Sequence, residues 1–307
     1  MFFTKYLQRF NSELDIIEYY INIRYQGAPT CHHCGSPKIS HRKTKPKVFQ
    51  CNNCNNSFSI FKGTIFEKTT TDLRKWFYAI HLLINSKKGI SGYQLQREIE
   101  VTYKTAWRML HKIRSSMNME TSSDLFHAFV EVDETYVGGK PRKDNEGMSP
   151  KGTKRGRGTK KQPVIGILDR ENKTVYAKVA QRNKDGKQLS GKQLLETIKE
   201  ACKCKNTTII TDEFKGYNIL HNKENKDNFT HLVIDHSKFF AEGEVHTNNI
   251  ESFWGTLKRG IYGIHHHVSV KYLQNYINEF CFRYNNREGK TFFVENIFER
   301  IVQNSIH

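Results

Sequence analysis

Two pairs of cysteines near the start of the chain constrain its folding more than any other feature. Each pair has the form CxxC, with Cys31 and Cys34 in "CHHC" and Cys51 and Cys54 in "CNNC". Sixteen residues separate the pairs, and at this spacing a β-hairpin can bring two CxxC turns together around a tetrahedral zinc ion. We therefore predict a zinc ribbon over residues 29–66 that folds only with its metal bound.

The remaining cysteines and the nearby histidines do not change this interpretation. The chain has 7 cysteines, and an odd number without a secretion signal argues against a disulfide framework. His32, His33 and His41 could each replace a cysteine as a ligand. Four thiolates already complete the shell of one zinc ion, so the cysteines are the expected ligands.

Residues 70–116 carry the signals of a helix-turn-helix. The stretch "LRKWFYAIHLLIN" has its apolar residues on one helical face. After it, Ser91 is expected to cap a short helix that ends near Ile99, and Thr102 to cap a second one that ends near Arg114. The N-terminal half of such a second helix can enter the major groove of DNA.

Within the second helix, Ala106, Trp107 and Leu110 are expected to face inward and Tyr103 outward. The candidate DNA-binding side chains, also expected to point outward, are Lys104, Arg108 and Lys112. A plain three-helix bundle with solvated lysines is the alternative.

The charge of the chain indicates a polyanionic partner. Lys and Arg number 49 against 31 Asp and Glu, which gives a formal net charge of +18 and a pI near 9.5. This excess favours nucleic acid over an anionic membrane surface, and no apolar run is long enough to span a bilayer. The basic, glycine-rich stretch 138–162 is either an arm that becomes ordered on DNA or a solvated linker.

The second half of the chain has the pattern of an α/β domain with a mixed sheet. Asp133 stands where we expect the first strand to end, and Asp212 ends a later strand. Glu251 lies on a helix further along the chain. The expected elements, in chain order, are a strand at 126–137, a hairpin at 163–181, a helix at 190–202, strands at 206–212 and 231–235, and helices at 248–259 and 270–286.

Three acids that are distant in sequence suit a two-metal site for phosphoryl transfer. Mg²⁺ and Mn²⁺ prefer oxygen ligands, and a pair of such ions can activate an attacking oxygen and stabilise a leaving one. We expect Asp133 to bridge the two ions, with Asp212 on one and Glu251 on the other. Clustered carboxylates without cations would repel one another strongly.

Each acid also has an alternative interpretation. Glu134 could be the ligand in place of Asp133, and Glu213 in place of Asp212. Glu251 could instead complete a capping box, with Asn248 as the N-cap residue.

Lys258 and Arg259 follow Glu251 on the same predicted helix, where a DNA phosphate next to the metal site would lie. Their position favours the catalytic interpretation of Glu251 over the capping box.

With these stretches in view, the chain resembles the DDE-type insertion-sequence transposases with an N-terminal zinc ribbon, the ISXO2-like group related to the Merlin elements. The resemblance covers nearly the whole chain, and its last stretch is the most specific. Besides the CxxC pairs, the matching stretches are "VDETYVGGK" (132–140), "PVIGILDR" (163–170), "IITDEFKGY" (209–217), "HLVIDHS" (231–237) and "VHTNNIESFWGTLKRGIYGIHHHVSVKYLQNYINEFCFRYNNR" (245–287).

The resemblance implies an RNase H-like catalytic domain that uses divalent metal to transpose DNA with terminal inverted repeats. It implies that Asp133 and Asp212 are the first two catalytic acids and that Lys258 contacts the transposon end. Related transposases have an acid or an asparagine at the third position, so Asn248 and Asn249 remain alternatives to Glu251. We choose Glu251 because a carboxylate binds Mg²⁺ better than an amide does.

The expected activity is metal-dependent cleavage at the terminal inverted repeats, followed by transfer of the 3′-OH strand into double-stranded target DNA. A DNA-binding regulator without catalysis, or a nuclease without strand transfer, would be the alternatives. We expect a homodimer or larger assembly on DNA, in the bacterial cytoplasm with the nucleoid, or in the nucleus of a eukaryotic host. The expected domains are an N-terminal helical segment (1–28), a zinc ribbon (29–66), a helix-turn-helix region (67–120), a catalytic domain (121–290) and a C-terminal tail (291–307).

Overall fold

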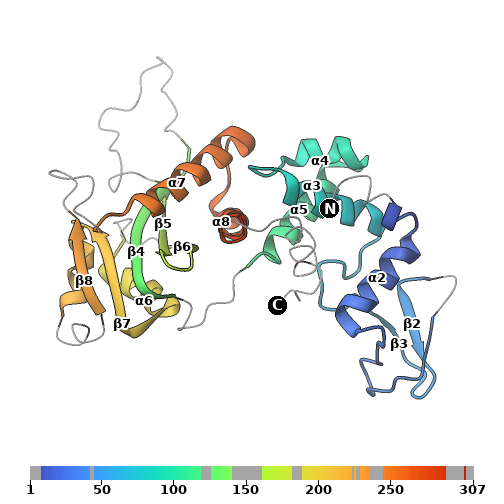
Figure 1. The fold of residues 1–307 in the computed structure, drawn as a ribbon. Coiled ribbons are helices and arrows are strands. Elements are labelled where there is room, and N and C mark those ends of the chain that lie inside the picture. Colours follow the sequence, from blue (N-terminus) through green and yellow to red (C-terminus); the bar gives the residue numbers. More distant parts are fainter. Residues whose placement is uncertain are drawn as a thin grey trace, which may run out of the picture. The chain divides into compact units, whose positions relative to one another are not determined.

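The computed structural model divides the chain into two compact units, which we describe separately. Unit 1 comprises residues 1–117 and 288–307, and unit 2 comprises residues 118–287. Figure 1 shows both units coloured along the sequence. The residues described are 8–41, 45–118, 126–139, 161–181, 189–222, 225, 229–234, 245–287 and 301. Most of the basic stretch 138–162 and of the tail 291–307 therefore lies outside the described residues.

Unit 1 begins with helix α2 (Glu13–Tyr25) and a small antiparallel sheet. Ser12 caps α2 in a reciprocal capping box with Asp15. The sheet consists of β1 (Ile39–His41), β2 (Val48–Cys51) and β3 (Ser57–Ser59), with β2 in the middle. The first CxxC turn precedes β1, and the second joins β2 to β3.

Three helices follow in unit 1: α3 (Leu73–Asn85), α4 (Gly92–Ile99) and α5 (Tyr103–Ser115). The two predicted caps are present, because Ser91 accepts a hydrogen bond from the backbone N–H of Gln94 and Thr102 one from that of Thr105. Glu100, in the left-handed conformation, makes the turn between α4 and α5.

Unit 2 is built on a five-stranded mixed sheet with the order β6-β5-β4-β7-β8. The strands β4, β5 and β6 pair antiparallel, whereas β7 and β8 run parallel to β4. The strands are β4 (Phe126–Val137), β5 (Gln162–Asp169), β6 (Thr174–Val179), β7 (Cys202–Asp212) and β8 (Phe229–Ile234).

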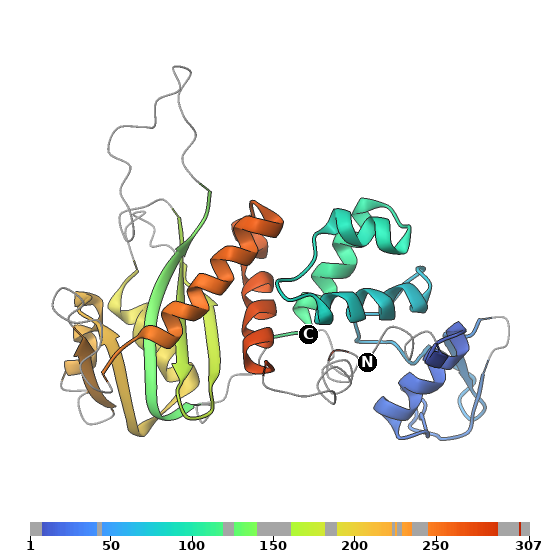
Figure 2. The ribbon, with the colours of Figure 1, turned by 45° about the horizontal axis from the view of Figure 1, so that its top comes forward.

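Helices cover both faces of this sheet, as Figures 1 and 2 show. Helix α6 (Gly191–Ala201) packs its Leu194 and Ile198 against Val130 and Val132 of β4 on one face. On the other face, α7 (Asn248–Gly260) and α8 (Val270–Asn285) form a second core with β5 and β6. The 3₁₀ helix η2 (Lys215–His221) follows β7, and a short π-helix, η3 (Ile261–His265), follows α7.

Three antiparallel strands followed by two parallel ones, between helical layers, confirm the predicted RNase H-like α/β fold class. The strand predicted at 126–137 matches β4, but the expectation that Asp133 stands at its end is wrong. Its antiparallel pairing with β5 continues to Val137, and only its pairing with β7 stops earlier. Within the described part of the chain, every helix is too short or too polar to cross a membrane.

Candidate active site and metal-binding groups

Asp133 and Asp212 lie side by side on neighbouring parallel strands. Glu131 of β4 is paired with Ile210 of β7, so a step of two residues along each strand places Asp133 level with Asp212. Asp212 is the last residue of β7, where the backbone turns away into η2. The edge at which β7 ends therefore brings together a pair of half-buried carboxylates from two segments far apart in the sequence.

A third carboxylate, that of Glu134, joins this pair. One side-chain oxygen from each of Asp133, Glu134 and Asp212 lies within 4.8 Å of the others, as the ligands of a hard divalent cation do. Glu134 is 8% exposed, and its Oε2 accepts a hydrogen bond of 3.0 Å from the Tyr217 hydroxyl. Glu213 is exposed and lies outside this three-acid group.

The carboxylates of this group repel one another, and a bound cation would reduce that repulsion. Burial and the charges of Glu134, Asp212 and Glu251 raise the pKa of Asp133 to about 8, against the opposing effect of a backbone hydrogen bond at Glu134. The indole Nε1 of Trp254 donates a 3.0 Å hydrogen bond to Oδ2 of Asp133. A divalent cation would stabilise the charged form of this carboxylate.

Helix α7 places its polar face beside Asp133. Because Trp254 bonds to Asp133, residues one turn before and after Trp254 share that face. Glu251 and Lys258 are those residues, and both interact electrostatically with Asp133. Burial lowers the pKa of Lys258, whereas the Asp133 carboxylate raises it. Glu251 is exposed and lies outside the three-acid group.

The capping-box alternative for Glu251 is wrong. Helix α7 begins at Asn248, so the N-cap residue is Thr247 and not Asn248, and the Thr247 side chain makes no capping hydrogen bond to the backbone. The Glu251 carboxylate accepts a 3.1 Å hydrogen bond from the Thr247 hydroxyl. A different residue, Glu131, satisfies the first backbone N–H groups of this helix.

Glu131 is a functional residue that the sequence reasoning missed. It is fully buried on β4, two residues before Asp133, and accepts hydrogen bonds of 3.1 and 3.0 Å from the backbone N–H groups of Asn249 and Ile250. It also accepts bonds from the Asn249 amide (2.8 Å) and from Arg170 Nε (2.7 Å). The carboxylate thus fixes the start of α7 onto the strand that carries Asp133. The available signal was its place beside Asp133 in the alternating pattern "VEVD".

Trp254 fits against the sheet because β5 has a glycine opposite Asp133. Gly166 is the residue paired with Asp133 across the two strands. A Cβ atom at Gly166 would lie 2.4 Å from Cζ2 of Trp254, so no larger residue leaves room for the indole. Gly166 therefore lets α7 approach the sheet closely enough for Trp254 to reach Asp133.

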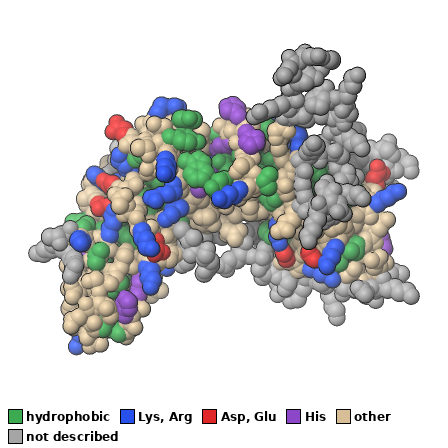
Figure 3. Space-filling view, turned by 180° about the vertical axis from the view of Figure 1, so that it is seen from behind, with side chains coloured by type: hydrophobic (Ala, Val, Ile, Leu, Met, Phe, Trp, Pro, Cys, Tyr) green, Lys and Arg blue, Asp and Glu red, His purple; other side chains and the backbone are tan. Residues whose placement is uncertain are grey.

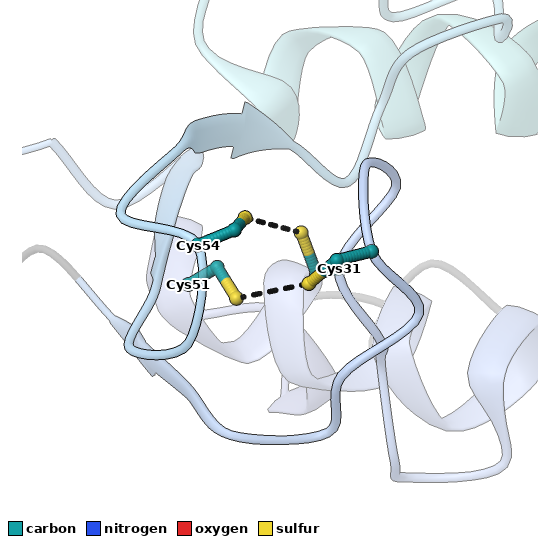
Figure 4. A group of neighbouring side chains, drawn as sticks. Cys31, Cys51 and Cys54 are labelled. Atoms are coloured by element: carbon teal, nitrogen blue, oxygen red, sulfur yellow. Dashed lines mark hydrogen bonds between the residues drawn. The ribbon is translucent and has the colours of Figure 1, made fainter.

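The four cysteines of unit 1 meet as predicted (Figure 4). The Sγ atoms of Cys31 and Cys54 are 3.7 Å apart and those of Cys34 and Cys51 are 3.6 Å apart. A tetrahedron with zinc–sulfur bonds of about 2.3 Å has edges of roughly 3.8 Å, so the group fits one zinc ion. A backbone hydrogen bond at Cys54 is the largest cause that lowers the pKa of Cys51, to about 6. His32, His33 and His41 are not members of this group.

Helices α4 and α5, predicted as a helix-turn-helix, present two of the three predicted DNA-binding side chains to solvent. Lys104 and Arg108 are exposed, and Ala106 and Leu110 are buried as expected. The outward orientation predicted for Lys112 is wrong. Its ammonium group is half-buried and donates hydrogen bonds to the carbonyl oxygens of Ile65 (3.0 Å) and Glu67 (3.4 Å), because the loop after the ribbon packs against α5. Trp107 is only partly buried and packs on His111.

Basic side chains gather on one face of unit 1. Figure 3 shows Lys and Arg side chains over the left part of the surface, with hydrophobic side chains among them and few acids. In unit 2, Arg259 is exposed at the end of α7 and donates a 3.1 Å hydrogen bond to the Thr256 hydroxyl.

Comparisons with other proteins identify a transposase family. A family model described as the ISXO2-like transposase domain matches residues 126–285. A protein of the transposable element ISH50 of Halobacterium salinarum is 30% identical over 290 residues, covering 90% of this chain and 92% of that protein. A transposase-like protein of Haemophilus influenzae is 31% identical over 113 residues, covering 37% of this chain and 85% of that protein.

Solved structures show only a remote likeness. A pre-cleavage Mos1 transpososome covers 75% of this chain and 79% of its own at 11% identity and a TM-score of 0.33. A Mos1 strand transfer complex covers 75% and 78% at 13% identity and a TM-score of 0.29. Scores this low carry no argument about the site.

Proposed function

The chain belongs to the ISXO2-like transposase family, and from that membership we propose that it is an active DNA transposase. It cleaves DNA at the terminal inverted repeats of its element and transfers the freed 3′-OH strand into target DNA. The observation that carries this proposal is the apposition of Asp133 and Asp212 on parallel strands, with Glu251 and Lys258 of α7 beside them.

The acids would hold two divalent cations, Mg²⁺ or Mn²⁺. Bound ions supply activation of the attacking oxygen and stabilisation of the leaving oxygen. Asp133 and Asp212 are the first two ligands in this proposal because they are neighbours in the three-acid group. Trp254 orients the Asp133 carboxylate through its indole N–H, and Tyr217 does the same for Glu134.

Glu251 is the third catalytic acid in this proposal. The side-chain amide of Asn249 already donates to the buried Glu131, which ties it to a structural role. Asn248 is exposed at the first turn of α7, but its amide is the weaker ligand for a hard cation. The charge of Glu251 contributes to the raised pKa of Asp133, which supports a cation shared by the two carboxylates.

The reaction consists of two displacements at phosphorus. Water first breaks the phosphodiester bond at the element end and leaves a free 3′-OH. That hydroxyl then attacks a target phosphodiester, forming one bond to phosphorus as another breaks, so no covalent enzyme intermediate is required. Lys258, and Arg259 at the end of the same helix, would contact the phosphates of the bound end.

Unit 1 would hold the terminal repeat. The four cysteines bind one structural zinc ion, and Lys104 and Arg108 of α5 contact double-stranded DNA. Two element ends must be cut together, so the protein acts as a homodimer or larger assembly on DNA. The domain limits proposed from the sequence (29–66, 67–120 and 121–290) remain our working division, and the protein would act in the compartment that holds the element's DNA.

The test is cleavage and strand transfer with a duplex that carries the element's own end. Wild type with Mg²⁺ should nick at the end and join a labelled 3′-OH strand to target DNA, whereas Asp212→Ala should bind without cutting. Glu213→Ala changes the exposed neighbouring acid and should behave as wild type. Binding by all three proteins with no cutting in Mg²⁺ or Mn²⁺ would contradict the proposal, and cutting without joining would limit it to a nuclease.

A further inference from the structure

Two tyrosine rings lie stacked on the outside of the helix-turn-helix. Tyr93 on α4 is 61% exposed and Tyr103 on α5 is 41% exposed. Their ring centroids are 4.4 Å apart, with 27° between the ring planes. Both residues stand in the first turn of their helices, Tyr103 directly after the capping residue Thr102 and Tyr93 two residues after Ser91. The two helix starts are thereby joined by one aromatic surface.

The fold of unit 1 does not require these rings to be aromatic. The interface between α4 and α5 is already formed by buried aliphatic side chains, among them Leu95, Ile99 and Leu110. A Cβ atom at Gly92 would lie 2.9 Å from Cε2 of Tyr103, so the glycine makes room for the stacked ring. A large aromatic pair kept in solvent at a fixed geometry is typical of a binding surface rather than of a core.

Exposed basic side chains lie on the same two helices as the rings. Arg97 lies one turn after Tyr93 on α4, and Lys104 and Arg108 lie one turn apart on α5; all three are exposed. The exposed acids nearby point elsewhere or form the turn. Glu98 acts on Tyr78 of α3, and the carbonyl of Glu100 accepts a bond from Lys75. We call Tyr93, Arg97, Tyr103, Lys104 and Arg108 the tyrosine surface.

We propose that the tyrosine surface reads the element end in double-stranded DNA, with the rings against base edges and sugars in the groove and the cations on the phosphates. The inference rests on the proposed function and adds Tyr93, Arg97 and Tyr103 to the residues that recognise DNA. Charge complementarity selects the partner, because three exposed cations on the two helices that carry the ring pair match a duplex better than an apolar protein surface.

The proposal can be tested because it gives the rings and the cations different roles in DNA binding. A phosphate contact contributes nearly equally on every sequence and adds to the salt dependence of binding, whereas a base contact discriminates between sequences. Removal of a cation should therefore weaken binding everywhere, and removal of a ring should weaken discrimination. The same residues acting only in folding would produce neither pattern.

The experiment measures equilibrium binding of the zinc-loaded protein, without divalent cation, to the element end and to a scrambled duplex over a range of salt concentrations. Tyr103→Ala should reduce the ratio of the two affinities about tenfold and leave the salt dependence unchanged. Lys104→Ala should weaken both complexes alike and lower the salt slope by about one. Leu14→Ala, at a 50% exposed apolar residue of the same unit, is the control and should change neither quantity.

Gly92→Ala tests the geometry without removing a ring. The added methyl group must displace Tyr103, whereas alanine favours the helix, so the variant should stay folded and still lose discrimination. The inference would be overturned if folded Tyr103→Ala and Gly92→Ala still preferred the element end over the scrambled duplex as strongly as wild type does. It would also be overturned if these variants changed only in their self-association and not in their DNA binding. Failure of wild type to prefer the element end would instead count against the proposed function, so the two failures are distinguishable.

Discussion

The two candidate metal sites differ in how completely the protein supplies their ligands. In unit 1, four cysteines from two tight turns gather in one group, which is a full tetrahedral shell. In unit 2, Asp133, Glu134 and Asp212 gather at a strand end, while Glu251 stands on a neighbouring helix and is exposed. A complete shell leaves no place for a substrate, whereas an incomplete one does, so the first site suits structure and the second suits catalysis.

Removal of zinc should have the largest effect and should sharpen this contrast. Chelation, or Cys51→Ser, should unfold the ribbon, because structural zinc contributes on the order of 10 kcal/mol in small domains of this kind. Hydrogen exchange should show lost protection in β1–β3 and retained protection in the sheet of unit 2. Equal loss of protection in both units would contradict a zinc ion that stabilises unit 1 alone. A ribbon that stays protected without metal would contradict a structural role for zinc.

Glu131→Ala should be the most destabilising single change in unit 2. It leaves the N–H groups at the start of α7 and the Arg170 guanidinium without their buried partner, at a cost of about 3–5 kcal/mol. Urea unfolding with and without Mg²⁺ measures this cost. Glu171→Ala, at an exposed acid, is the control. If Glu131→Ala lowered the free energy of unfolding no more than Glu171→Ala does, Glu131 would not be what fixes the start of α7.

Gly166→Ala should cost less stability and should affect catalysis. The methyl group meets the Trp254 indole, and overpacking of this kind costs about 1–3 kcal/mol. Displacement of Trp254 from Asp133 should lower the cleavage rate more than DNA binding. The same change at Gly263, where a Cβ atom would meet nothing within 4 Å, should leave the cleavage rate near that of wild type. Equal cleavage rates for the two variants would show that Trp254 does not position Asp133.

Lys258→Met should have the smallest effect on folding. The methionine keeps an apolar stem, so the free energy of unfolding should change by less than about 1 kcal/mol. The cleavage rate at the element end should fall about tenfold, and the salt dependence of binding should weaken. Lys215→Met, at an exposed lysine of η2, supplies the comparison. A large loss of stability in Lys258→Met would mean that this lysine serves the fold instead.

The cysteine site could be predicted almost entirely from sequence, because its ligands lie in two short turns that flank one small sheet segment, β1 and β2. The spacing alone determines which four side chains meet. The acidic site depends on tertiary structure. The predicted bounds of β4 (126–137) and the position of Asp212 at the end of a strand are correct. Asp133 was wrongly expected at the end of β4, because the antiparallel pairing with β5 beyond Asp133 has no local signal in the chain.

Three features of the structure had no local signal strong enough to predict them. Lys112 is turned inward by the carbonyl oxygens of a loop that starts more than 40 residues earlier in the chain. Glu131 bonds to N–H groups 118 and 119 residues away. The closeness of Trp254 to Asp133 requires a glycine on a third segment, β5. Such partners are fixed by packing of the whole unit rather than by any motif.

The most direct test of the contrast is the binding of Mn²⁺ to zinc-loaded protein, followed by the relaxation of water protons. An ion held by an incomplete protein shell keeps water molecules and shortens their relaxation time. We expect wild type and Glu213→Gln to bind one or two Mn²⁺ ions with strong enhancement of water-proton relaxation. Asp212→Asn should lose that enhancement. Mn²⁺ that fails to bind, binds without enhancement, or binds Asp212→Asn as tightly as wild type would contradict an open metal site at Asp133 and Asp212.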